Sequence, residues 1–227
     1  VNELIVQKPV ALVDPKKLLD DFRQYSWFME TDWLKSFHQI PIDLDSQKML
    51  AIVTPFGCFR PRFLPEGVQP ASAILAHVVR MIFADLGKIC IAAQDNLLIG
   101  AHSLDQLLDN FKIVAERCRK YNVILSARKT KFGIREAPFF GYIMGNGRYR
   151  VNPDRQAAIA RIEFPNSRKD MQSFLGMCLF VSPFIHDYSS KSASLTGLIH
   201  KDVKWDRDHG FDEEFAPEFA NLKKAVA

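Results

Sequence analysis

The sequence has few cysteines, and it lacks a long apolar run and any internal repeat. Its four cysteines contain no Cys-x-x-Cys pair, which argues against a zinc site and a disulfide framework. We expect free thiols, mostly buried. No apolar stretch approaches the roughly 18 residues that span a membrane, and the first residues lack the basic and apolar blocks of a secretory signal. We therefore expect an intracellular protein without membrane contact, in the nucleus or the cytoplasm.

The small net charge of +4 is unevenly distributed along the 227 residues. A phosphate backbone is attracted to clustered lysine and arginine side chains, whereas solvated charges on helices and loops are the ordinary alternative. Composition leaves both interpretations open for the stretch from Lys112 to Arg135. Against the single acidic residue Glu116, this stretch carries Lys112, Arg117, Arg119, Lys120, Arg128, Lys129, Lys131 and Arg135.

The first 151 residues predict strands mixed with helices. Apolar runs at 26–34 and 49–57 predict two buried strands, the second of them stopped by a Pro-Phe-Gly turn. Apolar residues at helical spacing predict helices at 71–86 and 103–121. Asp14 is the expected cap of an earlier helix that has Pro15 in its first position, and Ser103 is the expected cap of the last one.

The stretch "CIAAQDNLLIG", residues 90–100, predicts two short strands joined by a tight turn. Its tip is Asp95-Asn96, and Asn96 suits the positive φ that such turns demand. Two or three further strands are expected at 130–152, joined by "RE" and "GNG" turns.

After Pro153 the pattern changes to helices, at 153–162, 168–180, 182–189 and 195–201. The sequence therefore predicts a mixed α+β part, 1–151, and an all-helical part, 152–227.

Two acidic residues occupy comparable places, Asp32 at the end of a predicted strand and Asp95 at the hairpin tip. If the two strands are neighbours in one sheet, the carboxylates converge. Mg²⁺ prefers such hard oxygen ligands, and two ions can stabilise a phosphoryl displacement. Spacing alone favours the alternative, in which Asp32 ends a strand and Asp95 forms a turn.

Four stretches, in chain order, resemble the reverse transcriptases of gypsy-class LTR retroelements. "DWLKSFHQIPI" (32–42) is similar to the first palm motif, and "TPFGCFRPRFLPEGVQPASAIL" (54–75) to the loop that leads into the template-contacting helix. "LSARKTKFGIREAPFFGYIM" (125–144) resembles the motif beyond the catalytic hairpin, and 168–205 resembles the helical thumb.

This resemblance implies an α+β fold built as a right-hand polymerase. The palm, a sheet with helices on one face, would occupy 1–151 with partial fingers. The all-helical thumb and the start of the connection would occupy 152–227. In the family, the finger strands that grip the triphosphate precede a Leu-Asn that stands here as Val1-Asn2. The fingers are therefore expected to be truncated or absent.

The resemblance also implies roles for individual residues. Asp32 and Asp95 match the two principal metal ligands, so Mg²⁺ is the implied cofactor of an active enzyme. Asn96 stands where the family has a third carboxylate, and Ala93 where it has a tyrosine. Implied nucleotide or sugar contacts are Phe37, a gate that disfavours a 2′-hydroxyl, and Gln69. Implied primer or template contacts are Gly67, Lys129, Phe140, Gly141 and Tyr142.

Departures from the family pattern decide the functional prediction. The hairpin reads Ala-Gln-Asp-Asn instead of Tyr-x-Asp-Asp, and the 68–70 loop also differs. We predict a degenerate reverse-transcriptase-like domain, inactive or strongly impaired and without a cofactor, that serves as a nucleic-acid-binding or protein-scaffolding module. The alternative is an active RNA-directed DNA polymerase that uses Asp32 and Asp95.

The predicted partner is an RNA/DNA template-primer duplex bound through Lys112 to Arg135. A protein partner or a second copy of the chain stays open. Lys129 could approach a departing pyrophosphate, but a phosphate-backbone contact or a surface role is an equal alternative.

Overall fold

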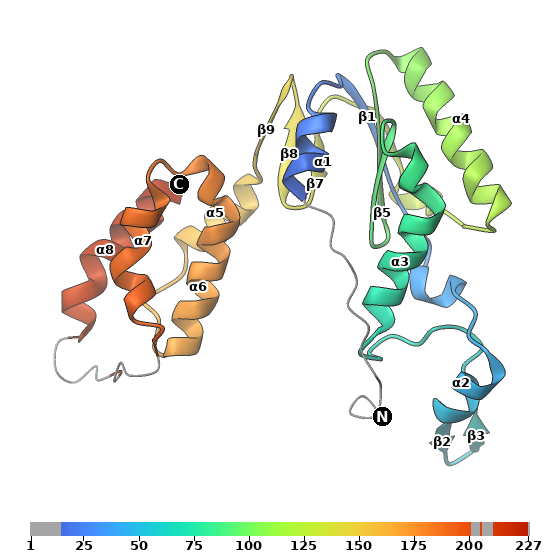
Figure 1. Ribbon diagram of the computed structural model, residues 1–227, viewed down its shortest axis with the longest axis horizontal. Helices are drawn as coiled ribbons and strands as arrows, with labels where there is room; N and C mark the ends of the chain where they lie inside the picture. The colour runs from blue at the N-terminus through green and yellow to red at the C-terminus, as the bar shows by residue number, and fades with distance from the viewer. Residues whose placement is uncertain (1–14, 201–204, 206–210, 227) are drawn as a thin grey trace. The chain divides into compact units, whose positions relative to one another are not determined.

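A computed structural model describes residues 15–200, 205 and 211–226 (Figure 1). The chain divides into two compact units, Val1–Tyr149 and Arg150–Ala227, which are described separately. The names palm and thumb for the two parts stay a prediction, and the expected cap Asp14 lies outside the described residues. The first described helix, α1 (Pro15–Phe22), begins at the proline that was expected in its first turn.

The first unit is built on a four-stranded sheet with the order β4-β5-β1-β6. Each neighbouring pair is antiparallel. The predicted strand at 26–34 and the predicted hairpin at 90–100 are confirmed, because they form the three strands β1, β4 and β5. The bounds are β1 (Trp27–Asp32), β4 (Cys90–Ala93), β5 (Asn96–Ala101) and β6 (Lys131–Ile134).

Two helices, α3 (Ala71–Phe83) and α4 (Leu104–Lys120), cover one face of this sheet (Figure 1). Both predicted helices are confirmed. A 3₁₀ turn, η3 (Ala84–Leu86), follows α3. Ser103 caps α4 as expected, because its hydroxyl oxygen accepts a hydrogen bond from the Gln106 amide. Strand side chains alternate between faces, so every second residue points into the helix-covered core. The core there includes Met29, Leu97, Ile99, Leu75, Val79, Leu107 and Val114.

The predicted buried strand at 49–57 is confirmed only in part: residues 52–54 form a strand that ends at the expected Pro-Phe-Gly turn, but this strand is exposed instead of buried. Asp43 caps a short helix, α2 (Leu44–Met49), by accepting from two main-chain amides. The rest of the run forms an isolated hairpin of β2 (Ile52–Thr54) and β3 (Gly57–Phe59), which Figure 1 shows apart from the four-stranded sheet. Val53 is 83% exposed and Phe56 91%. The apolar run stays exposed because this hairpin does not join the larger sheet.

A three-stranded sheet follows, of β7 (Ala137–Phe139), β8 (Tyr142–Gly145) and β9 (Arg148–Val151). With β6, the region expected to hold two or three strands therefore holds four. The "RE" segment lies between β6 and β7, and the last two residues of "GNG", Asn146 and Gly147, lie between β8 and β9. Phe140 and Gly141 separate β7 from β8.

The second unit consists of helices in its described residues after Pro153. The predicted helix at 182–189 is wrong, because only a 3₁₀ turn, η5 (Ser182–Phe184), forms there before the next α-helix begins. In the core of the second unit, Phe174 and Phe219 pack with ring centroids 4.5 Å apart. The helices are α5 (Pro153–Ala160), α6 (Arg168–Val181), α7 (Tyr188–Gly197) and α8 (Phe211–Val226).

The four cysteines are free thiols, and Cys90, Cys118 and Cys178 are buried, as expected; Cys58 is exposed. Burial raises the pKa of Cys118 to about 11 and that of Cys178 to about 12. Among the described residues, no helix has both the length and the apolar character that a membrane span requires.

Substitution of Gly100 tests the packing of β5 against Tyr25. A Cβ at Gly100 would lie within 3.0 Å of three ring atoms of Tyr25, so Gly100→Ala should lower the free energy of unfolding by about 1–3 kcal/mol. Chemical denaturation measures the change. Gly87→Ala is the control, because its added Cβ would make only an ordinary contact, 3.4 Å from the Ala84 carbonyl. Equal stabilities of the two variants would contradict this account.

Candidate functional site

Asp32 and the hairpin tip meet at one end of the four-stranded sheet. The antiparallel register places Asp32 opposite Asn96, the first residue of β5. One residue further, the Trp33 amide donates to the Asp95 carbonyl at 2.7 Å. The sheet therefore brings Asp32, Asp95 and Asn96 to the same strand ends. The predicted convergence of the two acidic residues required that their strands be neighbours, and they are.

The turn itself lies one residue earlier than the sequence indicated. Ala93 pairs with Asn96, so Gln94 and Asp95 are the two turn residues. Gln94 has the positive φ, 52°, that was expected for Asn96. Asn96 instead extends β5, where its side-chain amide donates to the Asp95 carboxylate over 3.5 Å. The intrinsic preference of asparagine for such turns is weaker here than the pairing register.

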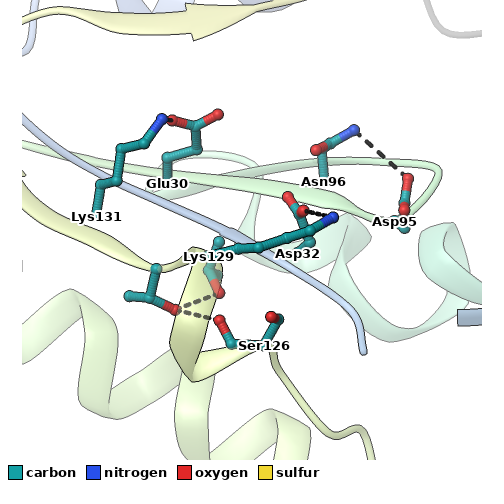
Figure 2. Close-up of polar contacts among 9 residues, drawn as sticks. Glu30, Asp32, Asp95, Asn96, Ser126, Lys129 and Lys131 are labelled. Carbon is teal, nitrogen blue, oxygen red and sulfur yellow. Dashed lines mark hydrogen bonds and ion pairs between the residues drawn. The ribbon is translucent and has the colours of Figure 1, made fainter. Parts of the chain in front are cut away.

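Lys129 contacts the Asp32 carboxylate directly (Figure 2). Its Nζ lies 2.8 Å from Asp32 Oδ2; the lysine side chain is 66% exposed and the aspartate side chain 16%. The pKa of the Lys129 ammonium is raised, first by this hydrogen bond and then by the negative charges of Asp32 and Asp95. A lysine side chain thus already satisfies one oxygen of the carboxylate.

The turn that carries Lys129 is bonded to the main chain of Asp32. The Ser126 amide donates to the Asp32 carbonyl at 2.7 Å, and the Lys129 amide donates to the Ser126 carbonyl at 3.1 Å. This turn is η4 (Ala127–Lys129), and a bridge between Trp33 and Leu125 flanks it. Lys129 is therefore anchored beside Asp32 through the backbone.

Hydrogen bonds of Thr31 and Thr130 stabilise this turn. Thr130 donates to the Ser126 carbonyl at 2.9 Å, and the hydroxyl oxygens of Thr31 and Thr130 lie 2.8 Å apart. Since Thr130 has a single hydroxyl proton, Thr31 is the donor in the second bond. Thr31 is fully buried, so this bond satisfies a hydroxyl that water cannot reach.

A second pair on the same face of β1 was missed by the sequence reasoning. Lys131 Nζ lies 3.0 Å from Glu30 Oε2 (Figure 2). The available signal was alternation, because Glu30 precedes Asp32 by two residues and Lys131 follows Lys129 by two. β1 thus carries two successive carboxylate–lysine pairs.

The donor set at this site does not fit a pair of divalent ions. Mg²⁺ takes hard oxygen ligands and prefers carboxylates, but the position opposite Asp32 carries the neutral amide of Asn96, and Lys129 already pairs with Asp32. In the described parts of the chain, no three acidic, histidine or cysteine side chains are grouped so as to hold a metal.

Three residues of the implied nucleotide and template contacts lie in two segments, η2 and the loop before α3. Phe37 is part of η2 (Ser36–Gln39) and packs half-buried against the core of the first unit. Gly67 and Gln69 are exposed in the loop before α3, and Gly67 has φ +82°, with no atom within 4 Å of an added Cβ. Their roles towards a nucleotide or template stay a prediction.

The implied primer contacts form the turn between β7 and β8. Phe140 and Gly141 both have positive φ, 51° and 77°, and Phe140 stacks edge-on against Phe139 with ring centroids 4.6 Å apart. Tyr142 is buried and meets the Tyr149 ring. The turn is well formed, and its primer role stays a prediction.

The basic run from Lys112 to Arg135 is distributed over α4, η4 and β6. Several of its cations have protein partners: Lys112 pairs with Asp109, Arg117 with Asp85, and Arg135 lies over the Trp27 ring. Lys129 and Lys131 pair as described above. Arg119 and Arg128 are exposed, and they are the clearest candidates for an external anion.

Residues 3–163 match the family model for "Reverse transcriptase (RNA-dependent DNA polymerase)". The retrovirus-related Pol polyprotein of transposon 297 from Drosophila melanogaster is 26% identical over the whole chain, which corresponds to 21% of that polyprotein. The Tf2-7 polyprotein of Schizosaccharomyces pombe is 24% identical over 87% of the chain and 15% of its own length. The chain thus spans about a fifth or less of these relatives.

A solved structure of the foamy viral protease-reverse transcriptase in complex with double-stranded DNA has the same fold. It matches 99% of this chain and 39% of its own, with a TM-score of 0.84 and 18% sequence identity. A complex of the foamy viral enzyme with an RNA/DNA hybrid matches 92% of this chain and 28% of its own, with a TM-score of 0.73 and 19% identity. These similarities support the mixed α+β fold.

The threonine pair behind the site can be tested by a double-mutant cycle. Thr130→Val should leave the buried Thr31 hydroxyl unsatisfied and cost about 1–3 kcal/mol of unfolding free energy. Thr31→Val/Thr130→Val should cost less than the two single changes together, by about 1 kcal/mol, because no hydroxyl is left without a partner. Urea denaturation of all four proteins measures the cycle. Additive effects would show that the two hydroxyls are not coupled.

Proposed function

The chain belongs to the reverse transcriptase family, and we propose that it is a catalytically impaired member that serves as a nucleic-acid-binding module. The observation that carries this proposal is the pairing of Asp32 with a neutral amide, Asn96, across the two strands where the family resemblance implies a third carboxylate.

The amide is expected to slow phosphoryl transfer. Stabilisation of charge in such a transition state is mainly electrostatic, and metal ions contribute several kcal/mol to it. If loss of one carboxylate removes roughly 3 kcal/mol of this stabilisation, the rate falls by about two decades. Pairing of Asp32 with Lys129 lowers the negative charge available to a metal further.

Retained binding is supported by the fold and by the exposed cations. The foamy viral relatives were solved with double-stranded DNA and with an RNA/DNA hybrid. In this chain Arg119 on α4 and Arg128 on η4 are exposed and available to phosphates. Contacts of this type give affinity without base specificity, and they do not require an intact catalytic hairpin.

An active RNA-directed DNA polymerase is the second candidate function. It is favoured by the hydrogen bond between the Trp33 amide and the Asp95 carbonyl, which keeps the hairpin tip against the strand of Asp32. Two carboxylates are therefore still held at one place.

Primer extension separates these two functions. The wild-type protein should give no template-dependent extension with Mg²⁺ or Mn²⁺, on DNA or RNA templates, and Asp95→Ala should give the same background. Asn96→Asp is the matched gain-of-charge variant, and any extension in this set of proteins is expected from it, above the wild-type background, because restoring the carboxylate recovers about two decades in rate. Wild-type extension that Asp95→Ala abolishes would establish the active polymerase instead.

Salt-dependent binding tests the retained module. Arg119→Glu/Arg128→Glu should weaken binding of an RNA/DNA hybrid and reduce the slope of log K against log salt by about one for each phosphate that the variant no longer binds. Fluorescence anisotropy at several salt concentrations measures the slope. Lys88→Glu/Lys224→Glu reverses two exposed charges outside the basic run and is the control. Absent or unaltered binding would favour a protein scaffold.

A further inference from the structure

The Lys129 ammonium lies where a cation would be expected on Asp32. Its Nζ is 2.8 Å from Asp32 Oδ2, and in Figure 2 the lysine side chain points towards the Asp32 carboxylate. We propose that Lys129 is an internal cation that takes the place of a divalent metal ion at Asp32 and keeps the affinity of the site for such ions low.

The anchoring of Lys129 supports this role. The long side chain is exposed, but its backbone is fixed through Ser126, whose amide donates to the carbonyl of Asp32 itself and whose carbonyl accepts from the Lys129 amide. The ammonium therefore starts close to the carboxylate, and little chain ordering is needed to form the pair. This gives Lys129 a high effective concentration at Asp32.

The charges at the site also support it. Asp32 and Asp95 contribute two negative charges, Lys129 contributes one positive charge, and Asn96 contributes none. A divalent ion that binds Asp32 must displace the ammonium or bind beside it, and like charges a few ångströms apart repel strongly. The sum of these charges therefore favours binding of the lysine ammonium to Asp32 over binding of a divalent ion.

The neighbouring pair on β1 supplies a matched comparison. Lys131 and Glu30 have almost the same geometry, 3.0 Å, and Lys131 has a similarly exposed side chain. Glu30 stands opposite Leu98 instead of an acidic or amide residue. Removal of the Lys131 charge therefore changes the surface potential by the same amount without opening a carboxylate of the candidate site.

A purely structural role for the Lys129 pair predicts a different outcome. Exposed ion pairs contribute little to stability, so in that case loss of Lys129 would change neither the folding nor the binding of ions appreciably. Metal affinity is the quantity that separates a competing cation from an ordinary surface pair.

The inference deepens the proposed loss of catalysis, on which it rests, but its test is independent of polymerisation. Mn²⁺ binding to the purified full chain is measured by the electron paramagnetic resonance signal of free Mn²⁺, without primer or nucleotide. Primer extension and Mn²⁺ titration can therefore fail separately.

Lys129→Met should raise the affinity for Mn²⁺ about tenfold or more, since it removes one positive charge next to the carboxylate. Lys129→Ala should behave in the same way, so a packing effect of methionine is excluded. Lys131→Met should stay within about twofold of the wild type, and circular dichroism confirms that each variant is folded.

Asp32→Asn in the Lys129→Met background should remove the gain, which assigns the bound ion to Asp32. The proposal is overturned if both Lys129 variants bind Mn²⁺ as the wild type does. It is also overturned if Lys131→Met gives an equal gain, or if the gain survives Asp32→Asn.

Discussion

The antiparallel register of β1 and β5 is the constraint on which the site depends. Met29 pairs with Ile99 and Thr31 with Leu97, on the face that α3 and α4 cover. A slip of one residue would move this apolar set to the opposite face, so burial fixes the register. The same register places Asp32 opposite Asn96. The positions of Asp32 and Asn96, on the face that also buries Phe28 and Leu98, are thus a consequence of the packing of the two strands.

Main-chain hydrogen bonds of Asp32 and Trp33 bring the other residues of the site to the end of β1. The Asp32 carbonyl accepts from Ser126, and the Trp33 amide donates to the Asp95 carbonyl, so the turn that carries Lys129 and the hairpin tip flank the end of the same strand. These bonds join residues that are far apart in the sequence. The site is therefore assembled by long-range backbone pairing, which side-chain substitutions on the polar face leave largely intact.

Much of the first unit could be predicted from the sequence, because its elements have clear periodicity. The helices at 71–86 and 103–121 and the strands around Asp32 and Asp95 follow from apolar spacing. The run at 49–57 could not be placed, since local apolarity does not reveal whether a neighbouring strand covers it. The position of the turn depended on which residues pair across the hairpin. The preference of asparagine for positive φ predicted Asn96 as a turn residue, but Asn96 pairs with Ala93, and Gln94 has the positive φ instead.

The pairing of Lys129 with Asp32 was beyond sequence reasoning for a similar reason. The two residues are far apart in the chain, and a lysine in a basic run is indistinguishable from its neighbours until the turn that carries it is placed. Alternation along β1 contained part of the signal, because Glu30 and Asp32 share a face and pair with Lys131 of β6 and Lys129 of η4. What was missing was the position of η4 and β6 along β1.

The contrast between the hairpin tip and the buried remainder of β5 explains how the side chains of residues 93–96 can vary while the fold is kept. Asn96 is exposed and Ala93 half-buried at the hairpin tip, whereas the remaining residues of β5, 97–101, are all buried. Clustered carboxylates repel one another, so replacing one by an amide, with Lys129 beside another, relieves repulsion that an active site must tolerate. On the proposed loss of catalysis, stability alone favours such changes. On the proposed function, the hairpin persists because the core holds its register. Its charged side chains are free to change because they do not take part in that core.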